Sequence, residues 1–240
     1  MQFPHSSQLD LWLIRLDEDL YQSSNAPLLS AEEMARAVKF KFELHRKRFI
    51  TARAGLRSIL SLYLDIEPQN IQLSATPKGK PFVENCDLQF NASHSHDFAL
   101  YAFIQQNPVG VDIEKIRSHY NDAVAERFFS SEEYEAFTKL PPEKKRAQFF
   151  KTWTGKEALV KALGEGLGYP LSTFTIPLQG RTQEIKLNHQ GTDQVWYLEN
   201  LDLFPDYQAA YATNKKMTQL SYFEWTAEGK KNWRKEEQRS

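Results

Sequence analysis

The stretch TWTGKEALVKALGEGLG, residues 152–168, predicts a long helix in the second half of the chain that carries charges on its apolar side. At about 100° per residue, the large apolar side chains of this region fall on one arc of the helix: Phe149, Trp153, Val160 and Leu163. Lys156 projects from the middle of that arc, and Glu157 and Lys161 border it. A solvated helix carries its charges on the opposite face. The pattern therefore leaves two interpretations, a buried ion pair or a cleft in which these charges meet a ligand.

The remaining elements are predicted outward from this helix, which we expect to start near Glu143 after a break at Pro141. Two further helices begin at capping serines: Ser30, with Glu33 completing a capping box and a helical pattern that continues to about Leu64, and Ser130, which precedes SEEYEAF. Strand-like runs are predicted at Leu9–Leu16, Leu88–Asn91, Phe98–Ile104 and residues 108–114. Beyond residue 168 we expect five short strands at Thr173–Ile176, Glu184–Leu187, Val195–Leu198, Gln208–Ala212 and Leu220–Trp225.

This order of helices and strands predicts an α+β protein of two similar-sized lobes that meet near Pro108. We expect residues 1–108 to form the N-terminal lobe and residues 109–227 the C-terminal lobe. Residues 228–240 are highly charged and are expected to be a frayed tail.

The composition excludes several classes of protein. The 240 residues are 41% hydrophobic, which is enough for a real core. Thirty basic residues against 31 acidic ones give a net charge of −1, so no overall charge favours nucleic acid or an anionic membrane. The single cysteine, Cys86, excludes an internal disulfide, and no apolar run reaches the ~18 residues of a membrane span. We therefore expect a cytoplasmic protein.

The strand VGVDIEK, residues 109–115, places two carboxylates on one face. Side chains alternate along a strand, so Val109, Val111 and Ile113 point one way. Asp112 and Glu114 point the other way. This face is either the solvated side of a half-buried sheet or a site for a hard cation, since Mg²⁺ prefers carboxylate oxygens.

A second candidate is the basic segment from Arg36 to Arg57, which holds eight basic residues and one acid, Glu43. On one continuous helix, four of the basic side chains would lie within about 40° of one another: Lys39, Arg46, Arg53 and Arg57. The segment is either a solvated basic face or a phosphate-binding surface built from arginines.

Two loops add further polar candidates. Lys80 lies in the turn TPKGKPF, where a backbone can approach a phosphate closely. Ser93 and His94, in NASHSH, can donate hydrogen bonds to phosphate oxygens. A zinc pair of His94 and His96 is disfavoured because no cysteine or third histidine is nearby.

Taken together, the segments GKPF, FNASHS, VGVDIEK, FFSSEE and WTGKEALVKALGEGL resemble, in order and spacing, the 4′-phosphopantetheinyl transferases of the two-lobed type that activates surfactin synthetase. The pairing of a GxDIE strand with a later WxxKEAxxK helix is the specific part of the match. The resemblance implies two pseudo-symmetric lobes in a monomer, each with helices packed on a small, mainly antiparallel sheet. It also implies transfer of 4′-phosphopantetheine from coenzyme A to a serine of an apo acyl or peptidyl carrier protein, with release of 3′,5′-ADP.

The resemblance assigns roles to individual residues. It implies that Mg²⁺, or alternatively Mn²⁺, is bound by three carboxylates, those of Asp112, Glu114 and Glu157. Lys161 would lie at the pyrophosphate, and Glu157 would be the general base, directly or through water on the metal. The positions expected to contact coenzyme A are Arg36, Arg48, Arg53, Lys80, Ser93, His94 and Lys161. Glu133 matches an acidic position that would assist the site.

The carrier protein and two rival functions are further expectations. By analogy, the segment from Tyr120 to Leu140, with Arg127, Phe128 and Phe129, would form the docking surface. The rivals are a metal-dependent nucleotide phosphohydrolase and a non-catalytic module that binds carrier proteins. Because all three carboxylates are present, the non-catalytic alternative is disfavoured.

Overall fold

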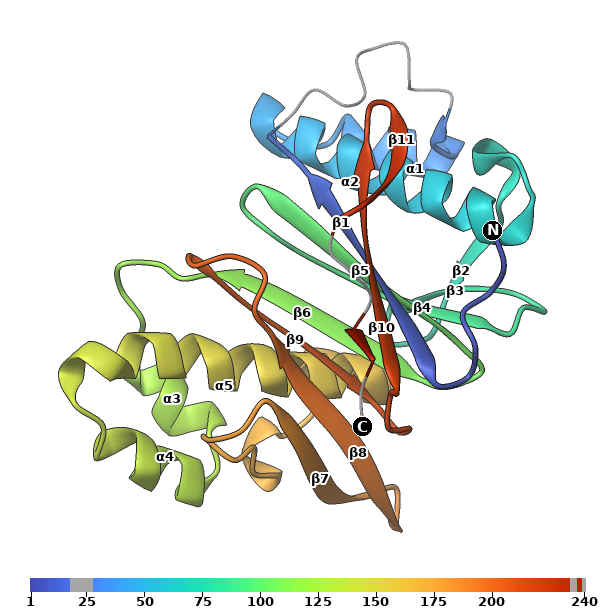
Figure 1. Ribbon diagram of the computed structural model, residues 1–240. Coiled ribbons are helices and arrows are strands. Elements are labelled where there is room, and N and C mark those ends of the chain that lie inside the picture. The colour runs from blue at the N-terminus through green and yellow to red at the C-terminus, as the bar shows by residue number, and fades with distance from the viewer. Residues whose placement is uncertain (18–27, 234–236, 239–240) are drawn as a thin grey trace.

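Four layers make up the fold seen in the computed structural model, which describes residues 1–17, 28–233 and 237–238 (Figure 1). Two sheets face each other in the middle, and a 22-residue helix covers the outer face of each: α2 (Glu43–Leu64) on the first sheet and α5 (Pro142–Leu163) on the second. This arrangement confirms the predicted α+β class with two lobes that each combine helices and a sheet.

The first sheet has the strand order β11-β10-β1-β5-β4. Its strands are β1 (Gln8–Arg15), β4 (Leu88–Ser95), β5 (Phe98–Gln105), β10 (Gln219–Thr226) and β11 (Gly229–Asn232), with β12 (Glu237–Gln238) paired to β10. Strands β1 and β10 are parallel, and every other pair in this sheet is antiparallel. A separate hairpin, β2 (Leu73–Ala75) and β3 (Pro81–Val83), carries the TPKGKPF turn.

The helical region of the first lobe is broken, where the sequence predicted one run. Helix α1 (Ala31–Ala37) starts at the predicted capping box of Ser30 and Glu33, and α2 starts only at Glu43. The linker turns because the Phe40 ring packs against Phe49 of α2, with ring centroids 5.2 Å apart. Lys39 therefore lies off the helix, and the predicted four-residue basic stripe does not form.

The second sheet is antiparallel, with the order β6-β9-β8-β7. Its strands are β6 (Val109–Lys115), β7 (Thr182–His189), β8 (Thr192–Leu201) and β9 (Tyr207–Thr213). The short helices α3 (Asp122–Phe128) and α4 (Ser131–Thr138) precede α5, and α4 has the predicted cap at Ser130. Helix α5 ends at Gly164, whose φ of 77° is readily adopted only by glycine.

Between the two sheets lies an apolar core that joins the lobes. It includes Leu11 and Leu100 from the first sheet and Val109, Val111 and Ile113 from β6, all buried. The predicted alternation along VGVDIEK is therefore correct, but its polar face is turned toward α5 and β4 instead of bulk solvent.

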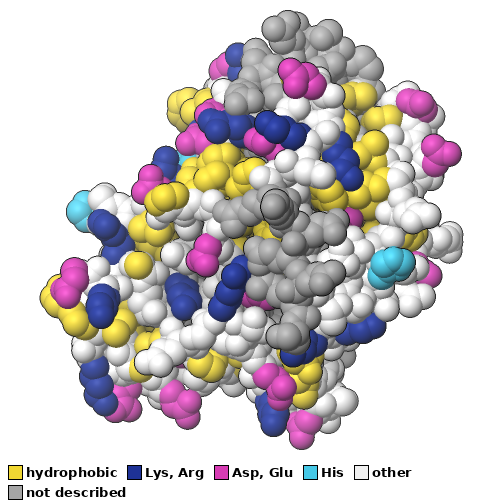
Figure 2. All heavy atoms as spheres, in the orientation of Figure 1, with side chains coloured by type: hydrophobic (Ala, Val, Ile, Leu, Met, Phe, Trp, Pro, Cys, Tyr) yellow, Lys and Arg dark blue, Asp and Glu magenta, His cyan; other side chains and the backbone are white. Residues whose placement is uncertain are grey.

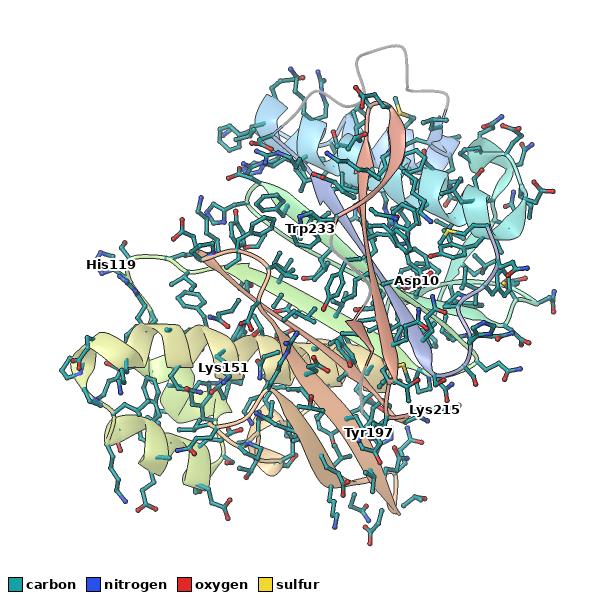
Figure 3. The ribbon with its side chains drawn as sticks, viewed as in Figure 1. Asp10, His119, Lys151, Tyr197, Lys215 and Trp233 are labelled. Atoms are coloured by element: carbon teal, nitrogen blue, oxygen red, sulfur yellow. The ribbon has the colours of Figure 1, made fainter. Side chains whose placement is uncertain are left out.

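The end of the chain corrects two predictions. Strand β10, expected in the C-terminal lobe, pairs with β1 and so completes the N-terminal sheet. Residues 229–232 of the expected frayed tail pair with β10, and Trp233 packs on Phe204 and Tyr222 beside the inter-sheet core (Figure 3). The large apolar surface of Trp233 explains why this part of a charged tail is ordered.

The predicted strand at Thr173–Ile176 is wrong. Residues Leu171–Thr173 form a 3₁₀ turn, and the following backbone pairs with none of the strands in the described part of the chain. The carbonyl of Phe174 instead accepts a hydrogen bond from Lys156, and the Ile176 N–H donates to Glu133. Side chains from α5 and α4 have thus taken the place of a neighbouring strand.

Gly110 sets how closely α5 approaches β6. A Cβ added at Gly110 would lie 2.0 Å from the carbonyl oxygen of Ala158 and 2.3 Å from the backbone nitrogen of Ala162. Both contacts are to backbone atoms, which cannot rotate away. Helix and strand are therefore in direct backbone contact beside the carboxylates of β6.

We expect Gly110→Ala to reduce the free energy of unfolding by about 3 kcal/mol or more, because the helix must be displaced. Urea unfolding followed by circular dichroism measures this loss. Gly168→Ala is the matched control, since a Cβ there meets nothing within 4 Å. Equal stability of Gly110→Ala and wild type would show that the helix can move without penalty.

Candidate active site

A cavity of about 470 Å³ opens between the two lobes and collects most of the predicted site residues. Its lining comes from α1, α2 and β3 to β5 on one side and from β6 and α5 on the other. The predicted residues in the lining are Arg36, Arg53, Ser93, His94, Asp112, Glu114, Glu157 and Lys161. Arg48 and Lys80 are not among them.

Asp112, Ser93 and Lys161 form the centre of the site. The Asp112 Oδ1 accepts hydrogen bonds from the Ser93 hydroxyl at 2.7 Å and from the Lys161 ammonium at 2.6 Å. Lys161 also donates to the Ser93 oxygen at 3.0 Å. The other carboxylate oxygen of Asp112, Oδ2, is buried and has no hydrogen-bond partner within residues 1–17, 28–233 and 237–238. A buried carboxylate oxygen without a partner is costly, and it is a candidate ligand for a cation.

Side chains of β4 form hydrogen bonds with the β6 backbone, on the edge of β6 that faces away from β9. The Asn91 amide oxygen accepts from the Val111 N–H at 2.9 Å. The Ser95 hydroxyl accepts from the Lys115 N–H at 3.1 Å and donates to Glu114 at 2.8 Å. Asn91 and Ser95 were not singled out from the sequence. The signal was present, since Asn91, Ser93 and Ser95 alternate along β4 and so share one face.

Glu157 brings a third carboxylate from α5 into the cavity. Its side chain is largely buried. Burial raises the pKa of Glu157 above its ordinary value, and the nearby charges of Asp112 and Glu114 add to this effect while Lys161 opposes it. The pKa of Glu114 is raised in the same way, by burial first and then by Asp112. Burial and like charge both disfavour the ionised forms of Glu114 and Glu157, so the site would gain from a cation.

The raised pKa of Glu157 predicts how the free energy of unfolding changes with pH. Since the folded pKa of Glu157 lies above its ordinary value of 4.5, the folded protein binds more protons than the unfolded chain, and stability falls as pH rises above 4.5 through the folded pKa. As the pH rises from 4.5 through the folded pKa of Glu157, we expect Glu157→Gln to lose less stability than wild type. Urea unfolding of both proteins in metal-free buffer, at pH 5 and above, measures the difference. Parallel curves would show that Glu157 ionises without hindrance.

Two arginines face the cavity from the first lobe. The guanidinium carbons of Arg36 and Arg53 lie 5.2 and 5.9 Å from the centre of the Phe49 ring, which therefore holds both side chains at the cleft. Arg53 also approaches Glu33 at 3.7 Å. Arg57 was predicted to belong to a basic face, but it is buried. It pairs with Glu33 at 2.6 Å and donates to two backbone carbonyls.

Two of the residues expected to contact coenzyme A are used elsewhere in the structure. Arg48 forms an ion pair with Asp97 in the β4–β5 turn at 2.5 Å. The Lys80 ammonium donates to the carbonyls of Val109, Lys161 and Ala162, at 2.9, 2.9 and 3.3 Å. Its three N–H donors are therefore engaged with backbone carbonyls, and the expected contact with phosphate stays a prediction.

The question of Lys156 is settled in favour of a buried ion pair. Its ammonium lies 2.7 Å from the Glu133 carboxylate and donates to the carbonyls of Leu171 and Phe174, each at 2.8 Å. Both charged side chains are fully buried. Burial raises the pKa of Glu133 and lowers that of Lys156, but the close contact favours the charged forms and opposes both shifts. Glu133 is therefore a structural residue, whereas the resemblance implied that it would assist the site.

The expected docking segment is only partly available. Phe129 is buried in a core with Phe137 and Phe149, so it cannot contact a partner. Phe128 packs on Trp153 at 5.7 Å, and Arg127 lies over the Phe128 ring. Trp153 also lines the cavity, so this aromatic pair connects α3 to the site.

Comparison with known proteins decides the family. Residues 108–212 match the model of the 4′-phosphopantetheinyl transferase superfamily, and residues 20–106 match that of the N-terminal part of 4′-phosphopantetheinyl transferases. The 4′-phosphopantetheinyl transferase HetI of Nostoc sp. is 40% identical over 208 residues, covering 84% of each chain. This chain belongs to the 4′-phosphopantetheinyl transferase family. It is therefore an enzyme, and the resemblance found in its motifs is confirmed.

More distant members of the transferase family match as well. The transferase psf-1 of Bacillus pumilus is 34% identical over 190 residues, with 79% of this chain and 80% of the relative covered. Sfp of Bacillus subtilis is 27% identical over 206 residues, with 84% and 91% covered. Since these matches extend over most of each protein, the family resemblance is not confined to the motifs around the cavity.

One face of this transferase shows no single dominant charge. On the face seen in Figure 2, acidic and basic side chains are interspersed. Within residues 1–17, 28–233 and 237–238, no helix is long and apolar enough to cross a membrane.

Proposed function

We propose that this transferase moves 4′-phosphopantetheine from coenzyme A to a serine hydroxyl of an apo carrier protein and releases 3′,5′-ADP. The observation that carries the proposal is the cavity itself. It places Asp112, Glu114 and Glu157 on one side of a single cleft and Arg36 and Arg53 on the other. A pyrophosphate held between cations and a carboxylate-bound metal is what such a cleft suits.

A divalent cation, Mg²⁺ or alternatively Mn²⁺, fits the three carboxylates. The support is the buried, unpartnered Oδ2 of Asp112 together with the raised pKa values of Glu114 and Glu157. Among the described residues, however, no three acidic or metal-binding side chains already converge closely enough to form a finished cluster. Lys161, 2.6 Å from Asp112, balances part of the negative charge. When bound, the metal would supply positive charge at the pyrophosphate.

The chemistry that we assign to the chain follows from charge. The serine oxygen attacks the phosphorus that carries the pantetheine arm, a new P–O bond forms, and the bond to the bridging pyrophosphate oxygen breaks. Lys161 faces the negative charge that develops on the leaving 3′,5′-ADP. Glu157 accepts the serine proton, and its raised pKa makes it a stronger base than a free carboxylate.

Arg36, Arg53 and His94 are proposed to hold the nucleotide end of coenzyme A. Arg36 lines the cavity, and its guanidinium lies over the Phe49 ring. Arginine forks match phosphate geometry, and the 3′-phosphate is the group we assign to Arg36. Ser93 is positioned to reach the pyrophosphate through the network it shares with Lys161.

We further propose that the acceptor is an acidic carrier protein of fatty-acid, polyketide or peptide synthesis. Arg127 and the exposed part of Phe128, beside Trp153 at the cavity, support contact at this edge of the second lobe. A monomer is sufficient for the reaction, because one chain supplies every residue assigned to the site.

The test is intact-mass spectrometry of apo carrier proteins incubated with this protein, coenzyme A and Mg²⁺, with a parallel EDTA sample. The expected result is a gain of one phosphopantetheine that is absent in EDTA. Carriers from fatty-acid, polyketide and peptide synthesis are tried side by side. Cleavage of coenzyme A without any gain on the carriers would instead indicate the phosphohydrolase, with water as acceptor. No reaction of either kind from folded protein would overturn the proposal.

A further inference from the structure

Lys80 joins three parts of the molecule through a single side chain. It lies on the hairpin of the first lobe, and its ammonium reaches the first residue of β6 and the last turn of α5. The aliphatic part of the side chain passes Gly164, where an added Cβ would lie 4.0 Å from the Lys80 Cδ. Lys80 is largely enclosed and does not line the catalytic cavity.

The contact with α5 satisfies carbonyls that the helix leaves open. The last carbonyls of an α-helix have no intrahelical partner and carry the negative end of the helix dipole. In α5 the N–H groups of Gly164 and Glu165 both donate to Val160. The Lys161 and Ala162 carbonyls are bonded by Lys80 instead. An ammonium in this position bonds both carbonyls and faces the negative end of the helix dipole, and burial lowers the pKa of Lys80 to about 8.

The contact with β6 continues a series along its unpaired edge. Lys80 binds the Val109 carbonyl, and Lys161 binds the next carbonyl on that edge, that of Val111, at 3.3 Å. The two lysines therefore lie along one edge of the strand that carries Asp112. Lys80 also holds the backbone of Lys161, so the same ammonium fixes both the helix residue and the strand to which its side chain reaches.

We infer that Lys80 is a positioning residue, which sets the Lys161 ammonium against Asp112 and the reacting phosphate by clamping the end of α5 to β6. This inference rests on the proposed function for the role of Lys161. It differs from the role that the motif implied, in which Lys80 contacts phosphate directly. Since Gly110 lets α5 touch β6 without an intervening side chain, a small movement of the helix end is passed straight to Lys161.

The first test separates positioning from ligand contact. In Lys80→Met we expect kcat to fall about 10- to 100-fold, because a misplacement of about 1 Å is enough for such a loss. The Kd of coenzyme A, measured by calorimetry, should stay within about 3-fold of wild type. Lys80→Arg, which keeps a charge and donors, should recover part of kcat. A Kd raised about 10-fold or more with unchanged kcat would show direct phosphate contact and overturn the inference.

Lys78→Met is the matched control on the same hairpin, since Lys78 pairs with Glu165 on the surface at 3.4 Å and lies outside the cavity. It should leave kcat and Kd unchanged. A double-mutant cycle adds a second criterion: Lys80→Met should cost almost nothing in a Lys161→Met background, because both variants remove the same ammonium from its place. Fully additive losses would contradict the inference.

A measurement without turnover keeps the clamp testable if the proposed reaction fails. Hydrogen exchange followed by mass spectrometry reports on the amides of Gly164 and Glu165, which close the last turn of α5. We expect these two amides to exchange faster than in wild type in Lys80→Met and at the wild-type rate in Lys78→Met. If wild type modifies no carrier, the proposed function fails on its own terms. Unchanged exchange in Lys80→Met would overturn the clamp whatever the activity.

Discussion

Glu157→Gln is expected to lower the rate of phosphopantetheine transfer by about 10²- to 10⁴-fold, the range in which a general base contributes. Glutamine keeps the shape of the side chain but cannot accept the serine proton or offer a charged ligand to a metal. The fold should persist, because the substitution relieves repulsion with Asp112 and Glu114. Single-turnover transfer followed by intact-mass spectrometry measures the rate, and urea unfolding checks the fold.

Glu143→Gln is the matched control for this variant. Glu143 lies in the first turn of the same helix, is exposed and does not line the cavity. It should transfer at the wild-type rate. If Glu157→Gln remains within a few-fold of wild type, Glu157 is neither base nor metal ligand, and the assignment of the three carboxylates fails.

Lys156→Met is expected to reduce the free energy of unfolding by about 3–5 kcal/mol, the usual loss when one member of a buried ion pair is removed. The fully buried Glu133 would lose its partner, and the carbonyls of Leu171 and Phe174 would lose their donor. Urea unfolding measures the loss. Methionine has a similar length, so the loss reports mainly on charge and hydrogen bonds.

The double variant Lys156→Met with Glu133→Gln separates a broken ion pair from poor packing. The Ser130 and Ile176 N–H groups donate to different oxygens of the Glu133 carboxylate in wild type, and a neutral glutamine keeps one of these two acceptors. We expect the double variant to recover about 1–3 kcal/mol of the loss. Lys139→Met, which breaks an exposed pair with Glu135, should have no measurable effect. A double variant less stable than Lys156→Met would show that the charge of Glu133 needs no partner.

Several features of this transferase follow from local pattern. The capping box at Ser30, the cap at Ser130, the long helix that starts after Pro141 and the alternation along β6 were all predicted and are all present. Each depends on residues within a few positions of one another. The motif pair in β6 and α5 also indicated the family, and the comparisons confirm it.

Other predictions failed where distant residues compete for a segment. Residues 173–176 have a strand-like pattern, but their backbone accepts a hydrogen bond from Lys156 and donates one to Glu133. The basic stripe of the first lobe fails because Phe40 packs on Phe49 and ends the helical run. Neither partner is visible in the local periodicity of the segment concerned.

The sequence by itself determined the class of the fold, the helix and strand that carry the carboxylates, and the family to which the enzyme belongs. Only the tertiary structure decided which charge meets which. Lys156 and Glu157 are neighbours in the chain, yet one is sealed in the core with Glu133 and the other opens into the cleft. Lys80 and Arg48 were both expected to contact coenzyme A. In the structure Lys80 binds the end of α5, and Arg48 pairs with Asp97 in a surface turn. The reason is physical: local pattern selects a helix or strand, whereas the partner of a charge depends on which elements pack against it, and that is set by long-range burial of apolar surface.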